Sequence, residues 1–165
     1  MLEKTPEIKV NIRPAVLKDV PIILKLIKEL SVFEKMSEEV TATEESLKLS
    51  LFGDKPYAQV LLAEVKGEPI GYALYFFNFS TFLGKPGLYL EDIYVKEEYR
   101  GKGIGTTLFK YCASIARKNN CSRMEWLVLN WNPARDFYEH IGAKPLEEWV
   151  VYRLTGDALD KMAKL

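Results

Sequence analysis

The strongest constraint on the fold of this chain is a set of glycines that follows an apolar segment near its middle. Residues 88–95 (LYLEDIYV) are rich in Leu, Ile, Val and Tyr, which predicts a β-strand. Gly101, Gly103 and Gly105 then lead into a stretch with apolar residues at helical spacing. Such glycines leave backbone N–H groups uncovered, and the positive end of a helix attracts anions. The segment therefore predicts a strand, a turn and a helix that suit a phosphate or pyrophosphate.

The spacing of these glycines excludes two common nucleotide-binding motifs. A P-loop ends in Gly-Lys-Ser or Gly-Lys-Thr after an earlier glycine, and the sequence has no such run. The dinucleotide fingerprint G-x-G-x-x-G is not matched, because the third glycine comes one residue early. On the glycines alone, an ordinary flexible connection between a strand and a helix is an equally good interpretation.

Composition indicates one globular domain spanning residues 1–165, with 48% hydrophobic and 28% charged residues. The formal net charge of zero gives no basic footprint for nucleic acid. The longest apolar run, near residues 72–77, is too short to cross a bilayer, and residues 1–6 lack the apolar core of a signal peptide. We therefore expect a soluble cytoplasmic protein that binds neither nucleic acid nor membrane.

Thiol and metal chemistry have little support in the sequence. Cys112 and Cys121 are the only cysteines and His140 is the only histidine. We expect reduced thiols, with Cys112 buried on the apolar face of the helix after the glycines. A Cys–His nucleophilic pair would have no third group to orient it, and no metal site is expected.

Periodicity, capping residues and turn residues predict alternating strands and helices, which indicates a mixed α/β sheet. Strands are expected at residues 10–13, 58–65, 70–77, 88–95, 124–129 and 149–154. Helices are expected at residues 20–33, 44–52, 104–119, 134–141 and 157–165.

Four motifs occur in order along the chain: residues 10–15 (VNIRPA), 100–105 (RGKGIG), 127–132 (LVLNWN) and 137–143 (FYEHIGA). They resemble the opening strand, pyrophosphate loop, fifth strand and closing helix of the Gcn5-related N-acetyltransferases. The resemblance implies a mixed, mostly antiparallel sheet with flanking helices. Its fourth and fifth strands would run parallel and splay apart, with acetyl-CoA bound as co-substrate in the gap.

The resemblance also implies which residues bind acetyl-CoA. The edge of residues 93–95 would pair with the pantetheine arm, and the amides of residues 101–106 would hold the pyrophosphate. The implied set is Ile93, Tyr94, Val95, Arg100, Gly101, Lys102, Gly103, Ile104, Gly105, Thr106, Asn132 and Tyr138. The family pattern N-x-x-A-x-x-F/L-Y is one residue shorter here, so Asn130 is an alternative to Asn132.

Acetyl transfer to an amine requires a neutral nucleophile, a stabilised oxyanion and a proton for the leaving thiolate. By resemblance Tyr138 is the general acid, although out of context a helix tyrosine usually packs on a sheet. Glu91 and Asp92 interrupt an apolar strand, where carboxylates are unfavourable. We expect Glu91 to attract the ammonium group and relay its proton, and the alternative is an inert carboxylate at the sheet edge. Asp92 is the weaker candidate and would bind substrate charge.

Within the family the chain is most similar to the spermidine/spermine and thialysine acetyltransferases, through residues 26–30, 89–92, 99–105 and 160–163. The implied amine site contains Phe33, Glu34, Ser80, Thr81, Glu91, Asp92, Glu125, Trp126, Leu127, Glu148 and Trp149. Acidic and aromatic groups together suit an alkylammonium chain. Residues 79–82 (FSTF) lack the additional acidic residue of the polyamine enzymes, which favours a thialysine- or lysine-like amine or diamine.

Three alternatives stay open at this point. A polyamine acetyltransferase differs only in substrate length and charge. A protein N-terminal acetyltransferase would need a peptide groove without acidic closure, which Glu34 and Glu148 argue against. A non-catalytic acyl-CoA sensor would need no working Glu91 or Tyr138. A homodimer is implied by the resemblance alone, and residues 149–154 suit an interface as well as a core.

Overall fold

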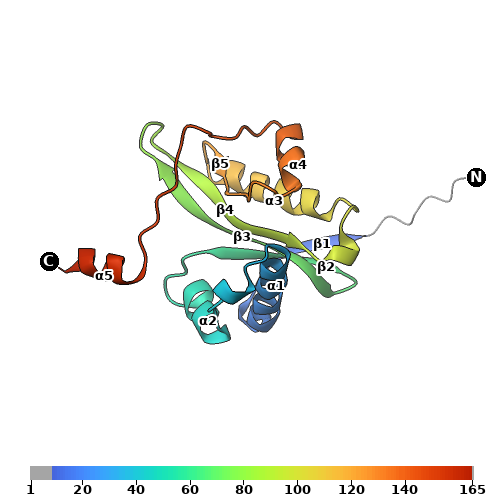
Figure 1. The fold of residues 1–165 in the computed structure, drawn as a ribbon. Coiled ribbons are helices and arrows are strands. Elements are labelled where there is room, and N and C mark those ends of the chain that lie inside the picture. Colours follow the sequence, from blue (N-terminus) through green and yellow to red (C-terminus); the bar gives the residue numbers. More distant parts are fainter. Residues whose placement is uncertain (1–8, 165) are drawn as a thin grey trace, which may run out of the picture. The chain divides into compact units, whose positions relative to one another are not determined.

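A five-stranded sheet in the order β1-β2-β3-β4-β5 forms the centre of the larger of two compact units (Figure 1). The computed structural model describes residues 9–164. The first unit extends to Leu127 and the second begins at Val128, and each is described by itself. The mixed sheet with flanking helices confirms the fold class expected from the sequence.

The strands of the first unit follow the predicted order along the chain. They are β1 (Val10–Pro14), β2 (Gln59–Val65), β3 (Glu68–Ser80), β4 (Lys85–Val95) and β5 (Met124–Glu125). The first four pair antiparallel, whereas β5 runs parallel to β4, as the resemblance implied. The sequence prediction of a strand over 124–129 is wrong in length, because the pairing with β4 stops at Glu125.

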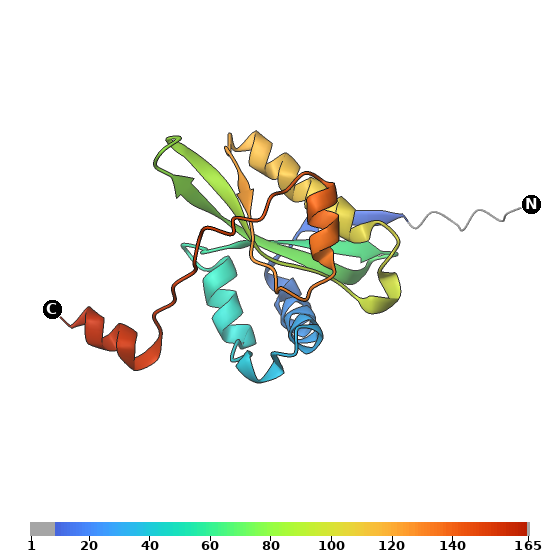
Figure 2. The ribbon, with the colours of Figure 1, turned by 45° about the horizontal axis from the view of Figure 1, so that its top comes forward.

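Helices cover both faces of this sheet, with α1 (Val20–Phe33) and α2 (Glu44–Phe52) on one side and α3 (Ile104–Lys118) on the other (Figures 1 and 2). The core under α1 and α2 is Ile23, Leu26, Leu30, Leu51, Val60, Leu62, Tyr72 and Tyr94. The amphipathic α3 buries Ile104, Leu108, Cys112 and Ala116, the spacing that predicted it. We call these the α1 face and the α3 face.

A β-bulge at Glu91 divides β4 into two segments. Leu90 pairs with Tyr75 and Asp92 with Leu74, so the register shifts by one residue at Glu91. The N–H of Leu88 donates to the carbonyl of Arg123, away from β3, whereas the N–H of Lys96 donates to the carbonyl of Ile70, toward β3. In a regular strand, residues an even number of positions apart point their N–H groups to the same side. Leu88 and Lys96 point theirs to opposite sides, because the bulge shifts the alternation by one residue.

The second unit contains α4 (Ala134–His140) and α5 (Gly156–Ala163), close to two predicted helices. The strand predicted at residues 149–154 is wrong, because the chain is irregular there. The segment is rich in apolar residues, yet Val150 and Tyr152 are exposed, and the described part of this unit contains no strand to pair with. A strand needs such a partner for its backbone groups.

Candidate functional site

The second half of β4 has one edge that no strand of the described chain covers. Pairing with β5 joins Leu88 to Met124 and Tyr89 to Glu125, and β4 then continues to Val95. Because Lys96 donates its N–H toward β3, alternation turns the N–H groups of Ile93 and Val95 toward this open edge. We call the segment from Leu90 to Val95 the open end of β4, and Leu88 with Tyr89 the paired end.

The glycine turn places uncovered amides close after the open end. Gly101 and Gly103 have φ angles of 71° and 76°, which only glycine adopts without strain. A side chain at either position would meet nothing within 4 Å, so both backbones are accessible. The first helical hydrogen bond of α3 runs from the N–H of Thr107 to the carbonyl of Gly103. The amides before Thr107 in α3 are therefore available to an anion, and the first turn holds no acidic residue.

Arg100 connects this turn to both β4 and α1. Its Nε donates to the carbonyl of Val95 at 2.9 Å. Its guanidinium lies 4.5 Å from the ring centre of Phe33 and 5.4 Å from that of Tyr94, both within cation–π range. Arg100, which the sequence predicts to assist pyrophosphate binding, thus also contacts the rings of Phe33 and Tyr94. Lys102 turns back instead, and its Nζ donates to the carbonyl of Glu98 at 2.7 Å.

Two carboxylates on the α1 face, those of Asp92 and Glu34, interact electrostatically. Asp92 is half-buried, and the hydroxyl of Tyr72 donates to its Oδ2 at 2.9 Å. Burial raises the pKa of Asp92 above its usual value, and the hydrogen bond from Tyr72 opposes that rise. Glu34 follows the last turn of α1, and its pKa is raised by burial and by the charge of Asp92. The pair can bind a cation or accept a proton.

Glu91 and Asp92 lie in different surroundings, although they are neighbours in the sequence. Glu91 is the bulge residue and its side chain is exposed, so it carries none of the burial cost that marks Asp92. Asp92 lies on the α1 face because its cross-strand partner Leu74 packs against the core there. The structure therefore brings Phe33, Glu34, Asp92 and Arg100 together on one face, with Glu91 at the neighbouring edge.

Several predicted substrate residues lie away from this cluster. Ser80 is six residues along β3 from the partner of Asp92, which is about 20 Å of extended chain. Its hydroxyl accepts from the N–H of Leu83, and Thr81 is exposed at the same hairpin turn. Trp126 packs edge-on against Phe109 of α3, with ring centres 5.1 Å apart, and so belongs to the α3 face.

Glu125 is engaged at the paired end of β4. Its Oε2 accepts from Nδ2 of Asn78 at 2.9 Å and from Nε of Arg123 at 3.0 Å. Leu127, the last residue of the first unit, is exposed. The network of Asn78, Arg123 and Glu125 joins β3 to β5 where the parallel pairing begins.

The remaining predicted residues belong to the second unit. Tyr138 is half-buried in α4, with its ring centre 5.6 Å from that of Phe137. The Oδ1 of Asn132 accepts from the N–H of Ala134 at 2.9 Å, so this side chain caps α4, whereas Asn130 offers its carbonyl to Arg135. Glu148 and Trp149 are exposed within the irregular segment.

Sequence reasoning missed Tyr72, whose hydroxyl is the partner of Asp92. The signal was present in the spacing of Tyr72 and Leu74, which share a face in any strand. The pairing of Leu74 with Asp92 could not be read from the sequence, because the bulge at Glu91 sets that register.

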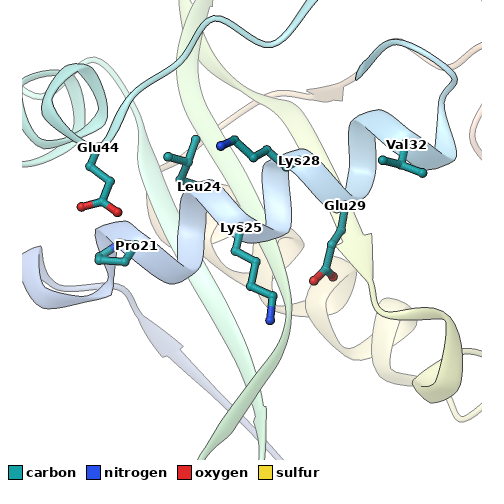
Figure 3. Close-up of a pocket in the computed structure, with 7 residues that line it drawn as sticks. All are labelled: Pro21, Leu24, Lys25, Lys28, Glu29, Val32 and Glu44. Atoms are coloured by element: carbon teal, nitrogen blue, oxygen red, sulfur yellow. The ribbon is translucent and has the colours of Figure 1, made fainter. Parts of the chain in front are cut away.

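A surface hollow of about 400 Å³ lies along α1. Figure 3 shows its lining, which mixes Lys25, Lys28 and Glu29 with the apolar side chains of Leu24 and Val32. In the described residues, no group of three His, Cys, Asp or Glu side chains could hold a metal ion. No helix in the part of the chain that the structure describes is long and apolar enough to cross a membrane.

Comparison with known proteins gives a consistent result. A family model described as "Acetyltransferase (GNAT) family" matches residues 24–143. The thialysine N-epsilon-acetyltransferase of Bos taurus is 43% identical over 93% of this chain and 97% of its own length. The L-ornithine N5-acetyltransferase of Arabidopsis thaliana is 34% identical over 94% of this chain and 88% of its own. An integron cassette protein from the mobile metagenome of V. cholerae superposes with a TM-score of 0.79 and 30% identity, covering 94% of this chain and 98% of that one.

Proposed function

Because this chain belongs to the GNAT acetyltransferase family, we propose that it acetylates the terminal amine of a small lysine-like molecule such as thialysine, using acetyl-CoA. The protein is an acetyltransferase that acts on a small-molecule amine. The observation that carries the lysine-like class is the electrostatic interaction between two carboxylates, Glu34 and Asp92, on the α1 face. Two neighbouring carboxylates in a half-buried setting favour a cationic ligand.

Two features of the first unit support acetyl-CoA binding. The accessible glycine turn and the first amides of α3 suit its pyrophosphate. The outward N–H groups of Ile93 and Val95 suit the amide-rich pantetheine arm, which would extend the sheet as an added strand. Arg100 would contribute positive charge beside the turn. When bound, acetyl-CoA supplies the activated thioester.

Residues of this chain would then carry out two proton transfers, one from the ammonium group and one to the leaving thiolate. An alkylammonium group has a pKa of about 10.4 and must lose a proton before its nitrogen can attack. Asp92 and Glu34 would bind the ammonium, and Glu91, at the edge of β4, would relay the proton to water. The new C–N bond forms as the C–S bond breaks, and Tyr138 would donate its phenolic proton to the leaving thiolate. Asn132 would orient the start of α4 for that role.

The substrate length follows from where the carboxylates lie. Ser80 and Thr81 are too far from Asp92 to contact the same end of a small amine. The preference for a lysine-like amine over a long polyamine therefore depends on two carboxylates at one place, rather than on these hydroxyls. A polyamine acetyltransferase is the second candidate, and a spermidine/spermine acetyltransferase-like protein of Homo sapiens is 38% identical over 93% of this chain.

We also propose that the protein works as a cytoplasmic homodimer. The exposed apolar side chains of the irregular segment, among them Trp149, Val150 and Tyr152, support a surface that a second copy would cover. Sedimentation at micromolar concentration tests this point independently of activity.

The test of the proposed function is acetyl-CoA consumption with thialysine, lysine, ornithine, putrescine, spermidine and an amino-terminal peptide. We expect the largest kcat/KM with thialysine or lysine. A larger value with spermidine would establish the polyamine alternative, and a larger value with the peptide would establish the N-terminal acetyltransferase. Acetyl-CoA binding without turnover of any amine would support the sensor and overturn the proposal.

A further inference from the structure

The α1 face contains a buried polar group that ordinary core packing does not require. Tyr72 lies in the middle of β3 with its residue surface 0% exposed, surrounded by apolar side chains of α1, α2 and β2. A phenylalanine would fill the same space without a hydroxyl that needs a partner. The hydroxyl of Tyr72 instead donates to Oδ2 of Asp92 at 2.9 Å.

Two titratable groups interact with Asp92 across elements: Tyr72 on β3 donates to it, and Glu34 after α1 is affected by its charge. Glu91 precedes it on β4. The ring of Tyr94 on β4 lies beside that of Tyr72, and Glu29 of α1 and Arg100 of the turn after β4 lie beside Tyr94. The guanidinium of Arg100 is held by the rings of Phe33 and Tyr94.

The hydroxyl of Tyr72 affects both the ionisation and the orientation of Asp92. Burial disfavours ionised Asp92, and the charge of Asp92 raises the pKa of Glu34. The hydrogen bond from Tyr72 favours the ionised form and fixes which oxygen of Asp92 points into the core. The other oxygen is then left for a ligand.

We propose that Tyr72 is a positioning residue for acetyl transfer, holding the carboxylate of Asp92 in the orientation and charge state that bind the substrate ammonium. Tyr72 is fully buried, so it acts through Asp92 and does not touch the substrate. The inference rests on the proposed function, because it assigns the origin of amine affinity to one hydrogen bond.

The sheet provides a matched control on its other face. Tyr75 lies three residues along the same strand, is 4% exposed, and donates its hydroxyl to Oε1 of Gln59 at 2.8 Å. Its partner is neutral, and burial and the nearby groups Cys112 and Tyr111 of α3 raise the pKa of its phenol. Tyr72→Phe and Tyr75→Phe therefore remove comparable buried hydrogen bonds, but only the first removes a bond to a carboxylate.

The experiment measures kcat and KM for the amine, across pH, in the wild type and in both variants. In Tyr72→Phe we expect the amine KM to rise about tenfold at pH 7 while kcat changes less than about threefold. The acid limb of kcat/KM should move to higher pH, because Asp92 loses the donor that lowers its pKa. Tyr75→Phe should stay within about twofold of the wild type at every pH.

A second variant separates positioning from general loss of packing. In an Asp92→Asn background, Tyr72→Phe should cause no further change in the amine KM, since the carboxylate it serves is gone. Equal effects of Tyr72→Phe in both backgrounds, or equal effects of Tyr72→Phe and Tyr75→Phe, would overturn the inference while leaving the proposed function intact. Absence of amine turnover in the wild type would instead overturn the proposed function.

Discussion

The two ends of β4 use similar residues for opposite purposes. At the paired end, Glu125 forms an ion pair with Arg123 and accepts a hydrogen bond from Asn78, and the backbone is hydrogen-bonded to both neighbours. At the open end, two carboxylates with raised pKa values interact electrostatically, and one backbone edge lies without a strand among the described residues. The bulge at Glu91 separates the two. A structural end satisfies its polar groups within the protein, whereas a binding end leaves them for ligands.

The largest expected effect comes from removing a charge at the open end. Asp92→Asn should lower kcat/KM for the amine by about 100-fold or more, because the ammonium loses a buried, hydrogen-bonded carboxylate. Glu125→Gln at the paired end, measured in the same assay, should change kcat/KM less than about twofold. Comparable losses in the two variants would contradict the division of β4.

The second largest effect is expected from a substitution in the glycine turn. Gly103→Ala should raise the KM for acetyl-CoA about tenfold, because alanine disfavours a φ of 76° and the turn would lose its shape. Gly67→Ala is the control, since Gly67 has a φ of 82° in the hairpin between β2 and β3, far from the turn along the chain. It should show similar strain in thermal unfolding with an unchanged KM for acetyl-CoA.

At the paired end the main effect should be on stability. Gly87 lies directly before the paired end, where a Cβ would collide with Oδ1 of Asn78 and lie 3.1 Å from Cγ of Arg123. Gly87→Ala should therefore lower the free energy of unfolding by about 1–3 kcal/mol, measured by urea denaturation. The kcat/KM per folded molecule should stay near that of the wild type. A selective loss of activity would place the paired end in the binding site.

The smallest effect expected is a dependence of stability on pH. Burial raises the pKa of Asp92 and Glu34 in the folded protein, so the folded state holds these protons more tightly than the unfolded chain. Their contribution to stability is therefore most favourable at acid pH and is lost as the pH rises through their raised pKa values. Asp92→Asn should unfold at a higher temperature than the wild type at pH 7, and the difference should shrink toward pH 4. If Asp92→Asn unfolded at a lower temperature than the wild type at pH 7, this would contradict the claim that the buried charge of Asp92 lowers stability.

Whether a feature of the structure could be predicted depends on how far apart in the sequence the interacting residues are. The strand, glycine turn and α3 follow from local signals, and the structure has them where the sequence predicts them. The bulge at Glu91 and the contact between Tyr72 and Asp92 depend on pairing between strands, which no local pattern encodes. For that reason the sequence alone could not show that Asp92 has a buried hydroxyl as its partner.

The strand wrongly predicted at 149–154 has a related cause. Apolar residues in that segment indicate a surface to be covered, but they do not say whether a sheet edge is available to pair with it. The positions of Ser80 and Trp126 likewise depended on the length of the β3–β4 hairpin and on packing against α3.

The central claim is that acetyl-CoA binds along the open end of β4, and amide hydrogen exchange tests it most directly. Adding acetyl-CoA should slow exchange at the N–H groups of Ile93 and Val95 by about tenfold or more, and should leave Leu88, already bonded to Arg123, unchanged. Protection at Leu88 equal to that at Ile93 and Val95, or at none of the three, would contradict the account.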